Sequence, residues 1–261
     1  MARRLFFVDA IRREHAELRG EDAHHLTRVL RVEAGQVYEI SDNDSLYLAE
    51  VESARKDLVV FRVLERRLPA EPAARVTLAA SLVKFDRFEW IIEKATELGA
   101  ERIVPVVAAR TERGLDRGAA RRLERWRKIA LESSQQARRP RLPQIESPEP
   151  LERTIQRTCD HRYLLDELPA ARPLVSLLPE DPARGASAAL LVGPEGGWTD
   201  EERAGALAAG WQAASLGRNI LRAETAAAAA LAVVVGFWEA GRSAFDTHLG
   251  EAVTQGVARQ P

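Results

Sequence analysis

The stretch LLVGPEGGWTDEE, residues 190–202, joins an apolar run to a glycine-rich turn and the start of a helix. The apolar residues end at Gly193, and three glycines and one proline occupy positions 193–197. Thr199 and Glu202 have the spacing of a capping box, in which each side chain accepts a hydrogen bond from the backbone N–H of the other residue. The stretch predicts a strand, a turn that allows close approach of the backbone to another group, and a capped helix.

Strands and helices alternate along the chain from residue 75 onward. The expected strands are 75–83, 103–108, 162–167, 188–193 and 212–217, and the expected helices are 86–100, 119–139, 199–210 and 224–241, with shorter ones after 150 and near 173–178. Continuous apolar strands between helices indicate a parallel sheet with both faces covered, an α/β domain. Ligands of such sheets bind outside the carboxyl ends of the strands, where residues 193–197 lie.

The first seventy residues are typical of a small β-barrel. Runs of β-branched and aromatic residues predict strands at 5–8, 36–41, 45–53 and 57–67, and residues 21–31, with Asp22 as a candidate cap, predict a short helix. The sequence therefore divides into a barrel domain (1–70), a proline-containing linker (68–74), an α/β domain (75–246) and a loose tail (247–261).

Composition limits the class of protein. The chain has 261 residues and 46% hydrophobic content, enough for a sizeable core, and it lacks the run of roughly 18 uncharged apolar residues that a membrane span requires. We expect a cytoplasmic protein with no membrane association. The single cysteine, Cys159, excludes an internal disulfide, and five scattered histidines suggest no metal site.

Basic residues concentrate in one segment. Residues 110–141 contain 11 Lys and Arg against 4 Asp and Glu, although the whole chain has a net charge of −1. Arginine predominates there, and its planar guanidinium suits phosphate contacts and base stacking. The segment indicates nucleic-acid binding, and a solvated helix face is the alternative.

A second glycine turn follows the first. In SLGRNILRAETA, residues 215–226, a strand ends at Leu216, Gly217 turns the chain, and a helix begins near Ala223. The chain contains neither a G-x-G dinucleotide fingerprint nor a phosphate-binding P-loop. Two glycine turns at neighbouring strand ends would instead present main chain to a flat heterocycle, which favours a nucleoside ligand.

These motifs resemble those of a known family. The segments HHLTRVLR (24–31), EKATELGAERIVPV (93–106), RWRKIALESSQQARRPRLP (125–143), GPEGGWTDEE (193–202) and LGRNILRAETAAAAAL (216–231) look like motifs of the bacterial small-subunit ribosomal RNA uracil-N3 methyltransferases, the RsmE type of the SPOUT superfamily. The likeness covers nearly the whole chain in order. Phe85, where the family usually has glycine, and Gln135, where it usually has glutamate, depart from the pattern.

The resemblance implies both fold and activity. The fold would be an N-terminal PUA-like β-barrel followed by a SPOUT α/β domain with a C-terminal trefoil knot at about 162–240. The protein would bind S-adenosyl-L-methionine, methylate a uridine at N3 in small-subunit (16S) ribosomal RNA, act on ribosomal RNA or the small ribosomal subunit, and form a homodimer. A non-catalytic RNA-binding protein that keeps only the scaffold is the alternative function.

The site residues follow from the matched motifs. The expected cofactor contacts are Leu165, Val192, Gly193, Pro194, Glu195, Gly196, Gly197, Leu216, Gly217, Asn219, Ile220, Leu221 and Arg222. The expected RNA contacts are Arg3, Arg4, His25, Arg28, Arg31, Arg121, Arg122, Arg125, Gln136, Arg139 and Arg218. No metal ligands are expected.

Two candidates carry the chemistry. A uracil that loses its N3 proton spreads negative charge onto O2 and O4, so Arg222 is the expected electrostatic stabiliser. Glu195 or Glu224 could accept the proton. Each carboxylate could instead cap a helix or form an ion pair with an arginine, and Arg222 is one candidate for that arginine. Trp90 and Trp126 are expected in the core.

Overall fold

The computed structural model describes residues 5–72, 74–180 and 185–257, with side chains described as far as Gly241. The chain forms two compact units. The first, Met1–Ala70 with Lys128–Leu142, is called the barrel unit here, and the second, Glu71–Arg127 with Pro143–Pro261, the sheet unit. Residues 128–142, which the sequence placed within the α/β domain, thus cluster with the barrel.

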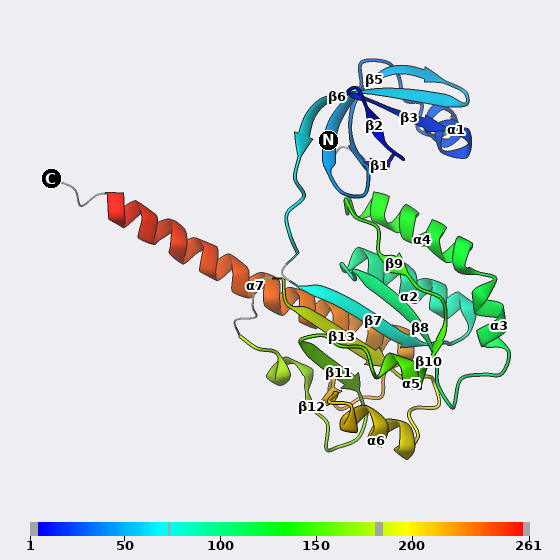
Figure 1. Cartoon of the computed structure of the whole chain (residues 1–261), viewed down its shortest axis with the longest axis vertical. Coiled ribbons are helices and arrows are strands. Elements are labelled where there is room, and N and C mark those ends of the chain that lie inside the picture. The colour runs from blue at the N-terminus through cyan, green and yellow to red at the C-terminus, as the bar shows by residue number, and fades with distance from the viewer. Residues whose placement is uncertain (1–4, 73, 181–184, 258–261) are drawn as a thin grey trace. The chain divides into compact units, whose positions relative to one another are not determined.

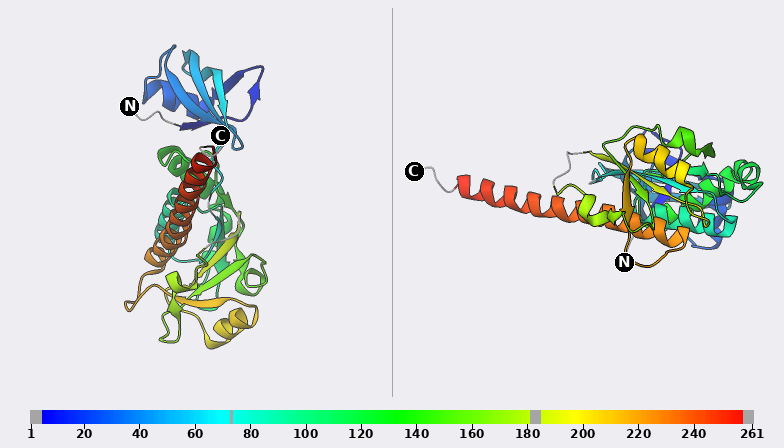
Figure 2. Two further views of the ribbon diagram at one scale, coloured as in Figure 1. Left: turned by 90° about the vertical axis from the view of Figure 1, so that its left-hand side faces the viewer. Right: turned by 90° about the horizontal axis from the view of Figure 1, so that it is seen from below.

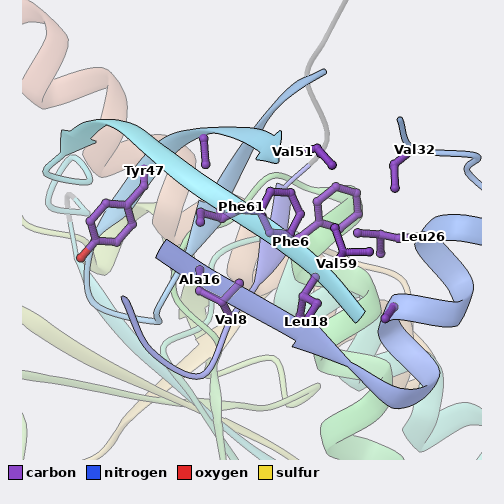
Figure 3. Close-up of a cluster of buried hydrophobic side chains, with 13 residues drawn as sticks. Phe6, Val8, Ala16, Leu18, Leu26, Val32, Tyr47, Val51, Val59 and Phe61 are labelled. Atoms are coloured by element: carbon purple, nitrogen blue, oxygen red, sulfur yellow. The ribbon is translucent and has the colours of Figure 1, made fainter. Parts of the chain in front are cut away.

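The barrel unit is built on a six-stranded sheet with the order β1-β4-β5-β6-β3-β2. Its elements are β1 (Leu5–Phe7), β2 (Ile11–Arg12), β3 (His15–Arg19), α1 (Gly20–Arg28), β4 (Val37–Ser41), β5 (Leu46–Arg55) and β6 (Leu58–Arg67). Strands β1 and β4 are parallel and the other pairs are antiparallel. Side chains from both ends of the sheet, among them Phe6, Leu18, Val59 and Phe61, fill its core (Figure 3).

The sequence pattern did not indicate the β2–β3 hairpin. The two residues of its turn, Arg13 and Glu14, have φ angles of 48° and 66°. Left-handed residues at both central positions make the type I′ turn that suits a hairpin, but Asn-Gly or Asp-Gly usually signals it. Arginine and glutamate give no such signal, so the hairpin was missed.

Helix α1 begins earlier than expected. Its N-cap is Arg19, which makes no side-chain capping bond, rather than the candidate Asp22. Asp22 lies in the first turn of the helix, where its negative charge interacts favourably with the helix dipole.

The sheet unit contains an eight-stranded sheet in which every pair of neighbouring strands is parallel. The strand order is β10-β8-β7-β13-β11-β14-β12, with β9 beside β8. The strands are β7 (Arg75–Ser81), β8 (Arg102–Val107), β9 (Gln144–Ile145), β10 (Glu149–Pro150), β11 (His161–Leu165), β12 (Arg172–Pro173), β13 (Ser187–Val192) and β14 (Gln212–Ser215). The expected parallel sheet is therefore confirmed.

Helices cover both faces of this sheet. The helices of the sheet unit are α2 (Phe85–Glu97), α3 (Leu115–Ala120), α5 (Leu151–Thr154), the 3-10 helix η1 (Leu174–Leu177), α6 (Asp200–Ala208) and α7 (Ala223–Val257). Helix α4 (Leu123–Gln136) begins in the sheet unit, and its residues from Lys128 onward belong to the barrel unit. Helices α2 and α7 contact each other, and α7 contacts β7 and β13, while α6 lies on the opposite side of the sheet (Figures 1 and 2). On the α6 side, Trp198 and Trp211 pack with Val104 and Leu191 in one buried cluster.

Two expectations about helices need correction. The helix expected at 119–139 is divided into α3 and α4. Trp126 is fully buried as expected, but Trp90 is 41% exposed. The buried positions of α2 include Phe88, Ile91 and Ile92, and at about 100° per residue Trp90 falls on the opposite face of the helix.

Helix α7 is longer than expected. It continues to Val257, whereas the sequence analysis assigned residues 247–261 to a loose tail. No proline interrupts the segment before Pro261, so nothing in the sequence forces the helix to end. Residues 258–261 lie outside the described part of the chain.

By length and composition, Ala223–Gly241 of α7 could cross a membrane, with a mean hydropathy of 1.4. Core helices of soluble proteins meet the same criterion. Here Ala230, Leu231 and Val234 are completely buried, and the helix contacts α2, β7 and β13. The core of the sheet unit therefore accounts for the apolar residues on the buried face of the helix, which make up 33% of this stretch.

Candidate functional site

A cavity of about 450 Å³ opens at the carboxyl ends of β11, β13 and β14. Its volume lies within the range of small-molecule sites, roughly 300–1,000 Å³. Every residue that the sequence assigned to the cofactor lines it. The residues lining it that were not assigned are Arg87, Asp166, Glu167, Trp198, Ala214, Ser215, Ala223 and Ala226.

The first glycine turn, Gly193–Gly197, forms one wall of the cavity. A β-carbon at Gly193 would lie 3.1 Å from the Trp198 ring, and Gly197 has a φ of +70°. The indole Nε1 of Trp198 donates to the carbonyl oxygen of Leu165 at 2.9 Å. The missing side chains were expected to make room for a ligand, but at Gly193 the chain's own Trp198 fills the space.

The predicted capping box is confirmed at the start of α6. Thr199 Oγ1 accepts from the N–H of Glu202, and Glu202 Oε2 accepts from the N–H of Thr199 at 2.9 Å. The other carboxylate oxygen, Glu202 Oε1, accepts from the N–H of Ala109 at 2.7 Å. The loop after β8 is thereby tied to the helix that follows the glycine turn.

Arg110 holds the same turn from outside. Its Nη1 donates to the carbonyl oxygen of Gly196 at 2.7 Å and to that of Trp198 at 3.3 Å. A β-carbon at Gly196 would lie 3.3 Å from the Arg110 side chain. A contact within the chain therefore also explains why residue 196 is a glycine. The first turn is fixed by its neighbours within the chain.

The second glycine turn, Gly217–Arg222, forms the facing part of the cavity lining. Gly217 has a φ of +127°, and a β-carbon there would meet nothing within 4 Å. Ser215 Oγ accepts from the N–H of Gly217 at 3.1 Å. Ile220 is 85% exposed and Leu221 is 36% exposed, so this turn presents apolar side chains to the surroundings.

Three ion pairs lie at the cavity, and two of them share Arg87. The Asp166 carboxylate bonds Arg203 of α6 at 2.6 Å and raises the pKa of that guanidinium. Glu195 pairs with Arg87 of α2, and Arg87 Nε also lies 4.0 Å from Glu224 Oε1. The arginine-pairing alternative for Glu195 and Glu224 is therefore realised, with Arg87 as the partner.

Arg222 lines the cavity and is exposed. Within the described ranges, no carboxylate lies within ion-pair distance of it. The alternative in which Arg222 pairs with Glu195 or Glu224 is wrong, because Arg87 occupies that role. The Arg222 guanidinium is available to a ligand.

The expected RNA contacts are spread over both units. In the barrel unit His25, Arg28, Arg31 and Gln136 are exposed and Arg139 is half-buried, and in the sheet unit Arg121, Arg125 and Arg218 are exposed and Arg122 is half-buried. Arg3 and Arg4 lie outside the described residues.

Arg122 and Arg125 share one carboxylate as a structural partner. Arg125 binds Glu89 of α2 through Nε and Nη2, at 2.7 and 2.8 Å, and Arg122 binds the same carboxylate at 3.0 Å. The hydrogen bond from Arg125 lowers the pKa of Glu89. Arg122 also lies 4.3 Å above the Phe85 ring, so the residue that departs from the family pattern is packed against a basic side chain.

No group of three or more possible metal ligands occurs in the part of the chain that the structure describes. Burial raises the pKa of the Cys159 thiol, which keeps it in the protonated form. Cys159 does not line the cavity.

Arg87, Arg110 and Glu167 are the main residues that sequence analysis missed. Each follows the carboxyl end of a strand, β7, β8 or β11, and the rule that ligands bind at such ends could have indicated them. These three residues lie in segments without a glycine-rich turn.

Comparison with known proteins agrees with this arrangement. Residues 69–235 match the model of an RNA methyltransferase domain, and residues 18–64 match that of an RNA methyltransferase PUA domain. The chain is 32% identical over 250 residues to the ribosomal RNA small subunit methyltransferase E of Bacillus subtilis, covering 88% of this chain and 94% of that one. It is 34% identical over 217 residues to the protein of the same name from Synechocystis, covering 81% and 69%.

Solved structures give the same result. The ribosomal RNA small subunit methyltransferase E of Neisseria gonorrhoeae, bound to S-adenosyl methionine, has a TM-score of 0.81 and 26% identity over 91% of this chain and 98% of that one. A methyltransferase of Legionella pneumophila in complex with the same cofactor has a TM-score of 0.80 and 26% identity, covering 90% and 97%.

Proposed function

Since the chain belongs to the bacterial small-subunit ribosomal RNA methyltransferase E family, we propose that it methylates N3 of a uridine in small-subunit ribosomal RNA. It is an S-adenosylmethionine-dependent methyltransferase with a PUA-like N-terminal domain and a mostly parallel α/β domain. The observation that carries the proposal is the joining of both glycine turns around one cavity.

The cavity fits the cofactor. Main chain of Gly193–Gly197 and of Gly217–Arg222 borders it, so backbone groups can bind a nucleoside while the apolar Leu165, Val192 and Leu216 flank a flat ring. We propose that these residues hold S-adenosylmethionine, which supplies a methyl carbon activated by a sulfonium. The task left to the protein is to hold the base and cofactor at reacting distance and to promote loss of the N3 proton.

Arg222 supports that second task. Its guanidinium lines the cavity and carries no ion pair in the described part of the chain, so its charge is uncompensated there. We place it against a carbonyl oxygen of the uracil, where it stabilises the negative charge that develops as N3 loses its proton.

The barrel unit is proposed to bind RNA. His25, Arg28 and Arg31 are exposed on and just after α1, and Arg121 and Arg218 are exposed in the sheet unit. Exposed arginines bind phosphates and release counterions, which gives affinity without sequence preference. The methylated position is then selected at the cavity.

Assembly and topology complete the proposal. We propose a cytoplasmic homodimer in which Ile220 and Leu221, both exposed, are covered by a second copy. We also propose a trefoil knot within about 162–240, and domains at 1–70 and 75–246. The knot is supported by family membership and by the strand order, in which β11 lies between β13 and β14.

The decisive experiment is mass spectrometry of small-subunit ribosomal RNA after incubation with the protein and isotopically labelled S-adenosylmethionine. We expect one labelled methyl group on a uridine, at N3. RNA binding without transfer of the label, together with no calorimetric signal for the cofactor, would identify the non-catalytic alternative.

A further inference from the structure

Two of the ion pairs at the cavity differ in solvent accessibility. In the Asp166–Arg203 pair the side chains are 1% and 13% exposed. In the Arg87–Glu195 pair they are 31% and 48% exposed. A buried pair fixes the structure around it, whereas an open pair on a cavity wall can form hydrogen bonds to a ligand.

The orientation of Arg87 leaves it donors for such a ligand. Its Nη1 donates to Glu195 Oε1, and its Nε lies 4.0 Å from Glu224 Oε1. Glu224 is only 14% exposed, and its Oε2 is a buried oxygen that has no hydrogen-bond partner among the described residues. A guanidinium has five N–H donors, so these two contacts do not exhaust it.

We propose that Arg87 and Glu195 together read the imide edge of the target base; this inference rests on the proposed function. That edge of uracil presents an N–H flanked by two carbonyl oxygens. A carboxylate beside a guanidinium presents an acceptor next to a donor, which matches N3–H and one neighbouring carbonyl. Cytosine has a lone pair at N3, which faces the carboxylate unfavourably, so the pair selects uracil.

The same contacts assist the reaction. Glu195 takes the proton from N3, and the electron pair left on the imide forms the new bond to the methyl carbon. The bond between that carbon and sulfur breaks, and its electron pair stays on sulfur. Arg87 stabilises the charge on the adjacent carbonyl oxygen, and Glu195 later returns its proton to water. Glu224 is a positioning residue that orients the guanidinium.

Substitution of Arg87 can be paired with a closely matched control. Lys94 lies on the same helix, is 30% exposed, and binds two carboxylates, Glu93 at 2.7 Å and Glu97 at 2.9 Å. It does not line the cavity. Arg87→Met and Lys94→Met therefore each remove one cation that contacts two acids, but only the first removes it from the cavity.

The test is single-turnover methylation at saturating S-adenosylmethionine and RNA. The RNA is small-subunit ribosomal RNA transcribed either with uracil or with 5-fluorouracil, whose N3 is more acidic. We expect Arg87→Met to lose about a hundredfold in rate on uracil RNA, as for removal of one donor to a developing anion. On 5-fluorouracil RNA the loss of rate relative to wild type should be smaller by roughly tenfold, because a more acidic N3 requires less stabilisation by the protein.

The controls separate the outcomes. Lys94→Met should keep the wild-type ratio of rates on the two RNAs, and calorimetry should show unchanged cofactor affinity for Arg87→Met. Glu195→Gln should make the rate increase with pH, since hydroxide must then remove the proton. Equal losses on both RNAs for Arg87→Met would overturn the inference. Failure of the wild-type protein to methylate uracil would instead overturn the proposed function.

Discussion

Both glycine turns at the cavity follow a strand and precede a helix, but they differ in the side-chain contacts that fix their backbone. Gly193–Gly197 is fixed by Trp198, by two hydrogen bonds from Arg110 and by the capping box of α6. Gly217–Arg222 is held by a single side chain, Ser215, whose Oγ accepts from the Gly217 N–H and donates to the Gly217 carbonyl oxygen, both at 3.1 Å, among the residues that the structure describes. This turn exposes Ile220 and Arg222. The first turn is preorganised, and the second has side chains available for a ligand or a partner. We expect cofactor affinity to depend mainly on the held backbone of the first turn, and the reaction rate on the side chains that the turns present to the cavity, Glu195 and Arg222.

The largest effect of a substitution is expected at Gly197, the last residue of the first turn. Gly197 has a φ of +70°, and a β-carbon there would lie 3.0 Å from Glu167 Oε1. Gly197→Val should abolish cofactor binding measured by calorimetry, because a β-branched residue is strained in this conformation. The control is Gly205→Ala in α6, where the nearest atom would be at an ordinary 3.7 Å. Wild-type affinity in Gly197→Val would show that the turn does not bind the cofactor.

The open turn should affect the rate instead. Arg222→Ala should retain cofactor affinity and lose about a hundredfold or more in single-turnover methylation, because a donor to the developing anion is removed. Arg222→Lys keeps the charge but loses the planar fork, so its loss should be smaller. If both variants methylate at the wild-type rate, Arg222 has no part in the reaction.

A smaller loss is expected when the clamp on the first turn is removed. Arg110→Ala deletes the hydrogen bonds to the carbonyl oxygens of Gly196 and Trp198 and should weaken cofactor binding by roughly tenfold. The rate at saturating cofactor should change little, in contrast to Arg222→Ala. A rate loss without an affinity loss would contradict the assignment of cofactor binding to the backbone of the first turn.

The contrast between held and open groups extends to the arginines of the basic segment. Arg121 is exposed, whereas Arg122 and Arg125 bind Glu89. The logarithm of RNA affinity falls linearly with the logarithm of salt concentration, and Arg121→Gln should make the magnitude of this slope smaller by about one. Arg122→Gln with Arg125→Gln should change that slope less and should lower stability.

The stability loss in that pair of substitutions has a defined pH range. The hydrogen bond from Arg125 lowers the pKa of Glu89 in the folded protein, so its stabilisation is present above the ordinary carboxyl pKa and is lost as pH falls through the lowered value. The variant should therefore differ from wild type in thermal unfolding at neutral pH and converge with it in acid. A constant difference across this range would exclude the ion pair as the cause.

Much of the fold could be predicted because periodicity and turn residues are local signals. The cavity-lining strands β11, β13 and β14, the capping box and both glycine turns were all indicated by neighbouring residues. The two-residue strands β9, β10 and β12 were not, because so few residues show no periodicity. The β2–β3 hairpin was not, because Arg13 and Glu14 adopt left-handed conformations without a glycine or asparagine.

The site was only partly predictable for a different reason. The residues on the two glycine turns were found, but Arg87 and Arg110 reach them from α2 and from the loop after β8, far away in sequence. Such contacts depend on the order of strands in the sheet, which a single sequence does not reveal. The exposure of Trp90 likewise depends on which face of α2 meets the sheet.

The Glu202 carboxylate bonds two backbone N–H groups, those of Thr199 and Ala109, which lie in different segments. An amide hydrogen exchanges with solvent only when its bond opens. The exchange rate of the Ala109 amide should therefore follow that of the first turn of α6 rather than that of its own loop. Opening of the start of α6 can then be measured at a residue that is distant from it in sequence.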